Sequence, residues 1–478
     1  IAVNILFIMN KKSYLYTNQD YWVGTPLSFR DSNAYSFAFL SDGYLNSRNV
    51  TSSIGVRPVI SLSSNVKLHG NGTWQNPYKV AENENPVTSQ LNLNENVITA
   101  SFTDDKGLSG YAISTSNTVT PTNWEKINGK TYDLNISLTT DGTYYLWVKD
   151  TDGNTTVSEP IIIVQKGWQT ILANSKINET TPDFNQISTT NEGLFKAQDD
   201  LGTSYYFRGA VDNNWVKFGK DSTGTDMYWR IIRINGDGSI RMVYTGTTAP
   251  TESTKVIMTG EGTGIGRSAF NSSSNSSEYV GYMYTVGQQH GTGTSSTIKT
   301  TIDNWYKTTT LETDAATKTL VADQIFCNDR TVTSGTWVST GSNFDYAPID
   351  RIFDNSPSLK CINESDKFTV NSSNGNGALI YPVGLITTDE INMAGGGSTN
   401  SSYYLYTNQY YWLGSPYKWS GSGANSFFVD VSGSLGLEGV NFVGARPVIS
   451  LSSKAKLSGS GTSVSYTHLR AHETRHDL

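Results

Sequence analysis

Apolar and polar residues alternate in short runs along most of the chain. Tyr, Val, Ile and Thr are frequent in these runs, and clusters of Gly, Asn and Ser separate one run from the next. Alternation with a period of two predicts β-strands, because successive side chains of a strand point to opposite faces. Long runs at helical spacing are scarce. The pattern therefore predicts a mainly β protein with some α-helix.

Short strands follow one another most closely between residues 84 and 165. This stretch contains LNLNENVITASFTDD, GYAISTS, YDLNISL, GTYYLWVKDTDGNTT and PIIIV. Their spacing predicts an antiparallel sandwich of about 80 residues. The segment DGTYYLWVKDTDGNTT resembles the closing hairpin of bacterial immunoglobulin-like modules, with Tyr144 placed like a tyrosine corner. The resemblance implies an immunoglobulin-like β-sandwich that serves as a spacer.

Two segments of the chain occur twice. Residues 14–26, YLYTNQDYWVGTP, match residues 404–416, YLYTNQYYWLGSP, at 10 of 13 positions. Residues 55–73, GVRPVISLSSNVKLHGNGT, match residues 444–462, GARPVISLSSKAKLSGSGT, at 14 of 19 positions. We call residues 14–73 the first ending and residues 404–462 the second ending. The match predicts that one structural unit is used twice.

The repeat predicts that the chain divides into four parts. Residues 166–463 are expected to form one complete domain, and residues 84–165 the spacer. Residues 1–83 are expected to be the truncated C-terminal part of a domain of the same type, because nothing before Tyr14 matches the stretch 167–403. Residues 1–12 match nothing in the second copy, which points to a false start of the reading frame. Residues 464–478 hold three of the five histidines and resemble translated sequencing-adapter sequence, so we expect a non-native tail.

Charge and hydropathy restrict the class of partner. The net charge of -7 and the pI of 5.4 leave no basic stripe for a phosphate backbone, which argues against nucleic acid. No apolar run is long enough for a membrane span, and the stretch Ile1–Met9 lacks the flanks of a signal peptide.

The two cysteines, Cys327 and Cys361, both lie in the long domain. An even number of cysteines in a chain that looks exported favours a disulfide that closes a loop of about 35 residues, with a stabilisation of about 3 to 4 kcal/mol. The alternative is two buried free thiols.

Several short motifs carry metal or acid–base chemistry in other proteins. His468, His472 and His476 recur every four residues, which would suit zinc on a helix, but the spacing is accidental if the tail is foreign. Residues 150–154, DTDGN, resemble the start of a calcium loop but lack its later ligands, so a hairpin turn is the preferred interpretation.

No catalytic set emerges from the remaining polar residues. Outside the tail only His69 and His290 are available, and His290 lies in a Gly-rich loop where we expect a solvated side chain. Asp389 and Glu390 are adjacent, and on a strand they would point to opposite faces. We therefore predict that the protein is not an enzyme and needs neither cofactor nor metal.

The two endings share a frame that resembles the closing part of bacterial surface domains with a formylglycine-generating-enzyme or C-type-lectin-like fold. Those domains end in Trp-x-x-Ser-Pro, a divergent stretch, Gly-x-Arg-Pro and an apolar strand. The resemblance implies an immunoglobulin-like sandwich between a truncated and a complete C-type-lectin-like (α+β) domain. The expected frame residues are Trp412, Gly414, Pro416, Gly444, Arg446 and Pro447, with Trp22 and Arg57 in the first ending.

Each frame residue has an expected structural role. Trp412 would fill the core, Gly414 and Gly444 would permit tight turns, and Arg446 would bond backbone carbonyls. The formylglycine-generating oxidase holds copper with a close cysteine pair, which Cys327 and Cys361 do not reproduce.

In related lectin-like proteins the divergent stretch of the frame forms the contact surface. Here it carries the candidate binding residues Tyr417, Lys418, Trp419, Asn425 and Asn441. Aromatic rings beside amides suit stacking and hydrogen bonding to sugars or protein loops. The alternative for Trp419 is packing in the core.

These features favour an extracellular, cell-surface or cell-wall adhesin of a bacterium that binds a host or microbial glycan or surface protein without catalysis. A passive stalk or cell-wall protein is the first alternative. The second is a non-catalytic part of a larger extracellular enzyme.

Overall fold

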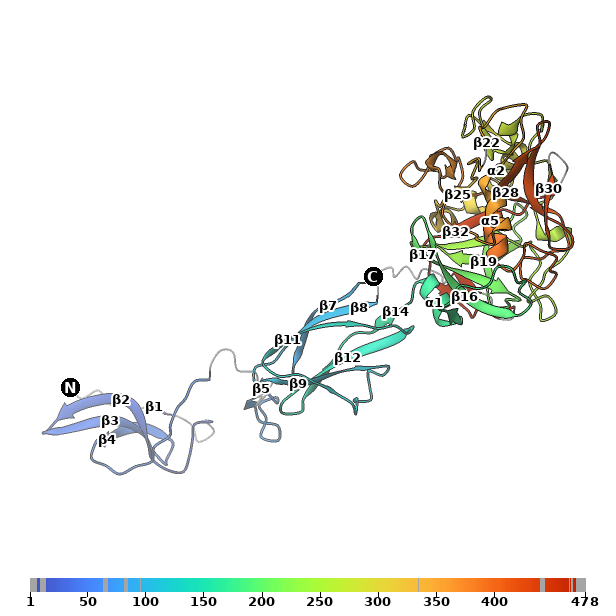
Figure 1. The fold of residues 1–478 in the computed structure, drawn as a ribbon. Coiled ribbons are helices and arrows are strands. Elements are labelled where there is room, and N and C mark those ends of the chain that lie inside the picture. Colours follow the sequence, from blue (N-terminus) through green and yellow to red (C-terminus); the bar gives the residue numbers. More distant parts are fainter. Residues whose placement is uncertain are drawn as a thin grey trace.

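The computed structural model describes residues 7–8, 14–62, 68–80, 85–94, 96–333, 335–438, 443–463, 465 and 467–469. Strands predominate over helices, which confirms the expected mainly β class with some α-helix. Three bodies follow one another along the chain (Figure 1). We call them the N-terminal unit (residues 7–8 and 14–80), the sandwich (85–163) and the C-terminal domain (167–469). In the part of the chain that is described, no helix has the length and apolar character needed to span a bilayer.

The N-terminal unit is one small sheet and a hairpin. The sheet has the order β1-β4-β3-β2, and β5 pairs with β6. The strands are β1 (Phe7–Ile8), β2 (Tyr21–Arg30), β3 (Asn33–Phe39), β4 (Tyr44–Asn49), β5 (Leu68–His69) and β6 (Lys79–Val80). Its buried apolar side chains are few, with Ala38, Phe39 and Leu40 the most enclosed. Most of the other apolar residues of the first ending are exposed.

The sandwich consists of two antiparallel sheets. One has the order β11-β8-β7, and the other has β10-β9-β12-β13 with β14 also on β12. Their strands are β7 (Val87–Asn94), β8 (Val97–Thr103), β9 (Leu108–Ser114), β10 (Glu125–Lys126), β11 (Thr131–Ser137), β12 (Gly142–Asp150), β13 (Thr155–Val157) and β14 (Ile161–Ile163). Alternate residues such as Ile98, Leu134 and Leu146 are buried between the sheets. The Tyr144 hydroxyl donates a hydrogen bond to the Thr140 carbonyl oxygen, four residues upstream.

The loop 150–154 is the hairpin turn between β12 and β13. Both Asp152 and Asn154 donate their backbone N–H to Asp150 Oδ1, and Gly153 has a φ of 92°. The carboxylate therefore organises the turn. Among the described residues, no three or more His, Cys, Asp or Glu side chains are grouped so that they could hold a metal ion.

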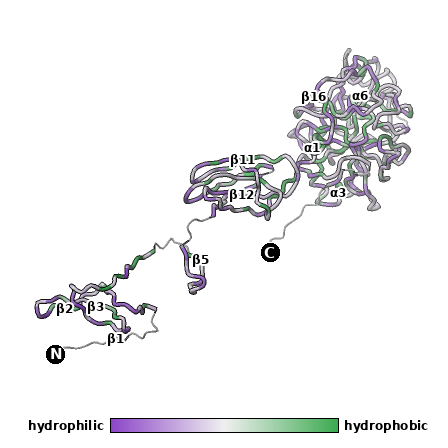
Figure 2. The backbone as a smooth tube through the Cα atoms, turned by 90° about the horizontal axis from the view of Figure 1, so that it is seen from below, coloured by the Kyte–Doolittle hydropathy of each residue, from purple (hydrophilic) through white to green (hydrophobic). Residues whose placement is uncertain are grey.

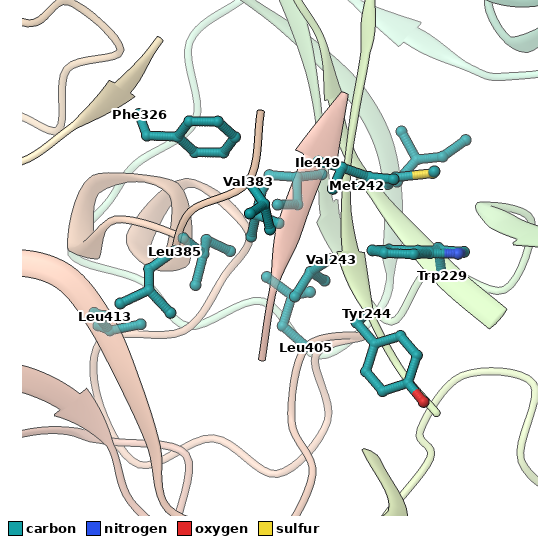
Figure 3. Close-up of a cluster of buried hydrophobic side chains, with 14 of the residues drawn as sticks. Trp229, Met242, Val243, Tyr244, Phe326, Val383, Leu385, Leu405, Leu413 and Ile449 are labelled. Atoms are coloured by element: carbon teal, nitrogen blue, oxygen red, sulfur yellow. The ribbon is translucent and has the colours of Figure 1, made fainter. Parts of the chain in front are cut away.

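A large mixed sheet forms the base of the C-terminal domain. Its strands are β15 (Ile177–Asn178), β16 (Asn191–Asp199), β17 (Gly202–Gly209), β18 (Trp215–Lys220), β19 (Asp226–Ile234), β20 (Ile240–Tyr244), β24 (Val321–Ala322), β32 (Val448–Leu451), β33 (Leu457–Ser458) and β34 (Thr467–Leu469). β32 lies between β20 and β24. Figure 3 shows Ile449 of β32 beside Met242 and Val243 of β20 in the core.

A second sheet contains most of the second ending. Its strands are β21 (Arg267–Ser268), β26 (Phe344–Asp345), β28 (Tyr411–Trp419), β29 (Ala424–Val429), β30 (Leu435–Glu438) and β31 (Val443–Gly444). Two small pairs are β22 (Met283–Tyr284) with β23 (Thr294–Ser295), and β25 (Phe326–Cys327) with β27 (Lys367–Phe368). One continuous core joins the two larger sheets.

The helices of this domain are short. They are α1 (Gly167–Ala173), α2 (Thr297–Tyr306), α3 (Thr310–Thr313), α4 (Ala315–Thr319), α5 (Ala347–Phe353) and α6 (Thr388–Met393), with 3₁₀ turns η1 (Glu261–Thr263), η2 (Ser277–Val280) and η3 (Glu364–Asp366). Thr387 and Glu390 form a capping box that starts α6. Asp389 and Glu390 thus lie in a helix and not in the strand that we expected.

Cys327 and Cys361 form a disulfide with a Cα–Cα distance of 5.6 Å, which confirms the predicted pairing. The bond joins β25 to the segment before η3. Cys361 is buried, and the loop between the cysteines carries α5. The disulfide therefore closes the segment that carries α5.

Candidate functional site

The β28–β29 hairpin carries four of the five expected binding residues. Tyr417 is half-buried and packs edge-on against Phe427, with ring centroids 4.8 Å apart. Lys418 places its ammonium group 5.3 Å from the Tyr417 ring centroid. The Asn425 side chain donates to the Gly423 carbonyl within the hairpin turn. Asn441 lies outside the described residues.

Trp419 differs from the expected exposed aromatic residue. Its side chain is 1% exposed and packs in a small cluster with Phe344 and Tyr346. The indole N–H donates to the Gly341 carbonyl oxygen at 3.3 Å. β26 pairs with the end of β28 and covers the Trp419 ring. Trp419 is therefore a packing residue.

The frame residues Trp412 and Arg446 are buried and hydrogen-bonded, and we call the part of the second ending that they anchor the wall. Trp412 is fully buried and donates its indole N–H to Ser268 O at 2.8 Å. The Arg446 guanidinium lies over the Tyr411 ring and donates to the carbonyl oxygens of Tyr244 and Leu405, which is the expected role. Burial lowers the pKa of Arg446 from its ordinary value, and the neighbouring Tyr411 and Tyr403 oppose this shift.

The two frame glycines have different roles. A Cβ on Gly444 would lie 2.5 Å from the Tyr410 carbonyl oxygen, so the close approach of the two backbones requires glycine here. Gly414, by contrast, lies inside β28, and a Cβ there would meet its nearest neighbours at 3.5 Å. Neither glycine forms the tight turn that we expected, since Gly414 lies in β28 and Gly444 lies in β31. Pro416 is buried in the same strand, and the Pro447 carbonyl accepts from the Tyr244 backbone N–H.

A hollow of about 320 Å³ lies against this wall. Three segments enclose it: η1 with the residues up to Arg267, the turn from Thr407 to Tyr411, and the stretch from Gly444 to Arg446. Val431 closes one side. The volume falls at the lower end of the range of small-ligand pockets.

Three polar side chains in the hollow have no hydrogen-bond or ion-pair partner among the described residues, and one aromatic ring is partly exposed. The Thr407 residue is 2% exposed, yet its hydroxyl has no hydrogen-bond partner. The side chains of Glu261 and Arg267 are exposed and bond to no other described residue. The Tyr410 ring, which packs on Phe428, is 42% exposed. An orphaned buried hydroxyl costs about 1–3 kcal/mol, which a bound hydroxyl or water would remove.

The first ending lacks these features. Its Thr17 hydroxyl donates to Gln19 O at 2.9 Å, and Asp20 stands where the second ending has Tyr410. Asp20 bonds to the Ser41 backbone and to Arg48, and the Ser41 hydrogen bond lowers the pKa of its carboxyl. Asp20/Tyr410 is the one difference between residues 14–20 and 404–410, whereas our expected contacts lay farther along the chain.

A second polar region is a buried cluster of charges. Arg233 pairs with Asp199 and Glu390, and Arg241 also pairs with Glu390. Burial alone would raise the pKa of Glu390, but the two arginines outweigh it and hold the pKa below its usual value. The cavity at their centre measures about 30 Å³, which is room for water only.

Arg351 extends this cluster through α5. Its guanidinium pairs with Asp329 and Asp389 at 2.7 and 2.8 Å. Burial alone would lower the pKa of Arg351, but the neighbouring Asp389 and Asp329 raise it above its usual value. Because every arginine of the cluster is paired, the region cross-links the domain and offers no reactive group.

We had expected a solvated His290 side chain, but its ring is hydrogen-bonded on both nitrogens. Its Nδ1 lies 2.9 Å from Asp366 Oδ2, and its Nε2 lies 3.3 Å from the Asn363 amide nitrogen. Asp366 also binds the buried Arg330. No hydroxyl of a described residue is hydrogen-bonded to His290, so the pair lacks the nucleophile of a hydrolase.

The sequence predicted a site on the β28–β29 hairpin. The structure instead favours the hollow as the candidate site. Tyr411 of β28 and the frame residue Arg446 line this hollow, together with Glu261, Arg267, Thr407 and Tyr410. Comparisons of the chain with known protein families, curated proteins and solved structures find no match.

Proposed function

We propose that the protein is an extracellular, cell-surface binding protein that recognises glycans without catalysis, and that the hollow beside the second ending receives a carboxylated sugar. The observation that carries the proposal is the orphaned Thr407 hydroxyl in a hollow lined by unpaired charges. The disulfide supports an oxidising location, because such bonds persist mainly outside the cytosol.

The chemistry of the hollow favours an acidic sugar. Arg267 at the rim and Arg446 in the floor supply positive potential that Glu261 only partly offsets. Thr407 would hydrogen-bond a sugar hydroxyl, and Tyr410 offers an exposed ring face for stacking. Glu261 would accept from further hydroxyl or amide donors of the ligand.

A glycan array probed with the full chain tests this proposal. We expect retention of glycans that carry uronic or sialic acids and weaker retention of neutral glycans. Binding of the best glycan should weaken as salt increases, because exposed charges contribute to it. Absence of binding to all glycans would favour the passive stalk.

Variants separate binding from stability. Thr407→Val should lower affinity about tenfold, equivalent to about 1.4 kcal/mol, while leaving the unfolding temperature unchanged or higher, because the orphaned hydroxyl is removed. Tyr410→Ala and Arg267→Ala should also weaken binding. Tyr14→Ala is the matched control, since Tyr14 is 91% exposed and lies outside the hollow. Equal affinities of all four variants would contradict the site.

A further inference from the structure

Two segments of the C-terminal domain meet at His290. Hydrophilic stretches of the chain are spread over this domain (Figure 2). His290 belongs to residues 285–293, which connect β22 to β23, and it contacts Asn363 and Asp366 at the two ends of η3. The His290 side chain is 25% exposed, while that of Asp366 is 0% exposed. The ring therefore lies at the boundary between solvent and a buried charge.

One nitrogen of the ring must donate. Asp366 Oδ2 lies 2.9 Å from His290 Nδ1. The same carboxylate accepts the backbone N–H and the side-chain Nε–H of Arg330, each at 2.8 Å, and its other oxygen pairs with Arg330 Nη2 at 2.6 Å. Because Asp366 is the acceptor in all of these contacts, the hydrogen that it shares with the ring is carried by His290 Nδ1.

The other nitrogen of the ring must accept. Its neighbour is the side-chain amide nitrogen of Asn363, which lies 3.3 Å from His290 Nε2. The orientation of this amide is fixed, because Asn363 Oδ1 accepts the Ser365 backbone N–H at 2.9 Å and so caps η3. The Asn363 NH2 group thus donates to Nε2, which has to carry a lone pair. The two contacts together select a neutral ring with its hydrogen on Nδ1.

A second proton on the ring would break this arrangement. An imidazolium ring carries a hydrogen on both nitrogens, so its Nε2–H would face the NH2 group of Asn363, and neither group could accept. Asn363 can resolve this conflict by turning its carbonyl oxygen toward the ring, but the Ser365 N–H then loses its acceptor. The cap of η3 and a charged His290 therefore exclude each other.

The charged groups around the ring largely offset one another. Asp366 attracts a proton on the ring, and Arg330, which is bound to Asp366, opposes it. The direction of the hydrogen bonds therefore distinguishes the two states of the ring more than the net charge does. The other charged groups on the neighbouring elements are engaged elsewhere, and they are Glu278 with the Gly287 N–H, Glu364 with Lys367, and Lys367 with Asp200.

We propose that His290 and Asn363 form a pH-sensitive contact between residues 285–293 and η3. Histidine is the side chain whose charge changes between about pH 5 and 8. Above that range the neutral ring accepts from Asn363, and η3 keeps its cap. Below it the charged ring still donates to Asp366, Asn363 turns its oxygen to Nε2, and the start of η3 opens. The disulfide fixes Cys361 just before this segment, so the opening stays within η3.

Heteronuclear NMR of the ring nitrogens and hydrogen exchange of the full chain test this contact. At about pH 8 the His290 ring should be neutral with its hydrogen on Nδ1, and at about pH 5 it should be charged. The signal is assigned by its loss in His290→Gln. The protection factor of the Ser365 amide, which corrects for the intrinsic pH dependence of exchange, should fall at least about tenfold from pH 8 to pH 5 as the cap is lost.

Three results would overturn the proposal. The first is a ring with its hydrogen on Nε2 at about pH 8, and the second is a ring that is still neutral at about pH 5. The third is a charged ring with unchanged protection of Ser365.

The isosteric variant Asn363→Asp separates the pH-sensitive contact from general acid unfolding. Its carboxylate can accept from the Ser365 N–H and from His290 Nε2–H at once, so the conflict disappears. Protection of Ser365 should then be the same at both pH values. Asn304→Asp, at an exposed position of α2, adds the same charge elsewhere and should behave as the wild type does. An equal loss of protection in the Asn363 variant and the wild type would contradict the contact.

Discussion

The two endings have the same local structure in very different surroundings. In the first, Tyr21 pairs with Phe39, Pro26 with Ser36 and Phe29 with Ala34, with irregular pairing on both sides of Pro26. In the second, each of these pairs recurs 390 positions later, with irregular pairing on both sides of Pro416. The stretches that diverge in sequence therefore form the same hairpin, down to its bulges.

The difference between the endings is in what covers them. Phe29 is 75% exposed and its equivalent Trp419 is 1% exposed, while Tyr14 is 91% exposed and Tyr404 is 2% exposed. Short-range pairing, the stacked arginine and the close glycine contact form without the covering elements. The frame therefore encodes its shape locally, and the large sheet and β26 supply the burial.

The largest expected effect comes from one substitution made in each ending. Ile449→Asp places a charge where no partner exists and should destabilise the C-terminal domain by more than about 4 kcal/mol. Ile60→Asp, at the matching exposed position, should change stability by less than about 0.5 kcal/mol. Urea unfolding followed by segment-resolved hydrogen exchange measures both. Similar losses would refute the contrast in burial.

The buried charges of the C-terminal domain have no counterpart in the first ending. Glu390→Gln leaves the buried Arg241 without a carboxylate partner and Arg233 with Asp199 alone, and should cost about 3–5 kcal/mol. Because the folded pKa of Glu390 is lowered, its contribution is present above the unfolded carboxyl pKa of about 4.3 and is lost as pH falls through the folded pKa. Unfolding measured against pH should show this loss in the wild type and not in the variant. Glu364→Gln, whose side chain is 78% exposed, is the control and should have little effect.

The disulfide should stabilise only the domain that contains the second ending. Replacing Cys327 and Cys361 with alanine together should lower the free energy of unfolding of that domain by about 3 kcal/mol. Hydrogen exchange in residues 14–62 should not change. A loss of protection there would show that the N-terminal unit depends on the C-terminal domain for its shape.

The smallest effect is expected at the last hairpin. His69 pairs with Lys79 in the first unit, and Ser458 pairs with His468 in the second. His468→Lys installs the residue of the matching position and should change stability by less than about 0.5 kcal/mol, because the side chain is exposed. Thermal unfolding of the wild type and of His468→Lys measures this change. A larger shift would mean that the His468 side chain, rather than its backbone, holds the strand.

Patterning and self-comparison predicted much of the fold. The alternation gave the β class, the strand runs in 84–165 gave the two-sheet sandwich, and the cysteine count gave the disulfide. The roles of Trp412 and Arg446 followed from residue type and position in the frame. The resemblance to lectin-like and immunoglobulin-like families stays a prediction.

The candidate site was harder to predict because it depends on long-range packing. Trp419 is buried by β26, a strand of two residues more than 70 positions upstream, and no local pattern marks it. Glu261 and Arg267 join the hollow from η1 and β21, two elements of three and two residues that are too short to show a periodic pattern. Asp389 and Glu390 were placed on a strand, but the capping box of Thr387 starts a helix there.

The hairpin of β33 and β34 has a practical consequence. Thr467–Leu469 occupies the place that Tyr78–Val80 holds in the first unit, although the two sequences share no residue. The position next to β33 is held by main-chain hydrogen bonds, which any extended segment without proline can supply. It is therefore a permissive position for protein engineering, where an epitope, a biotin acceptor or a surface-attachment peptide could be grafted without redesign of the core.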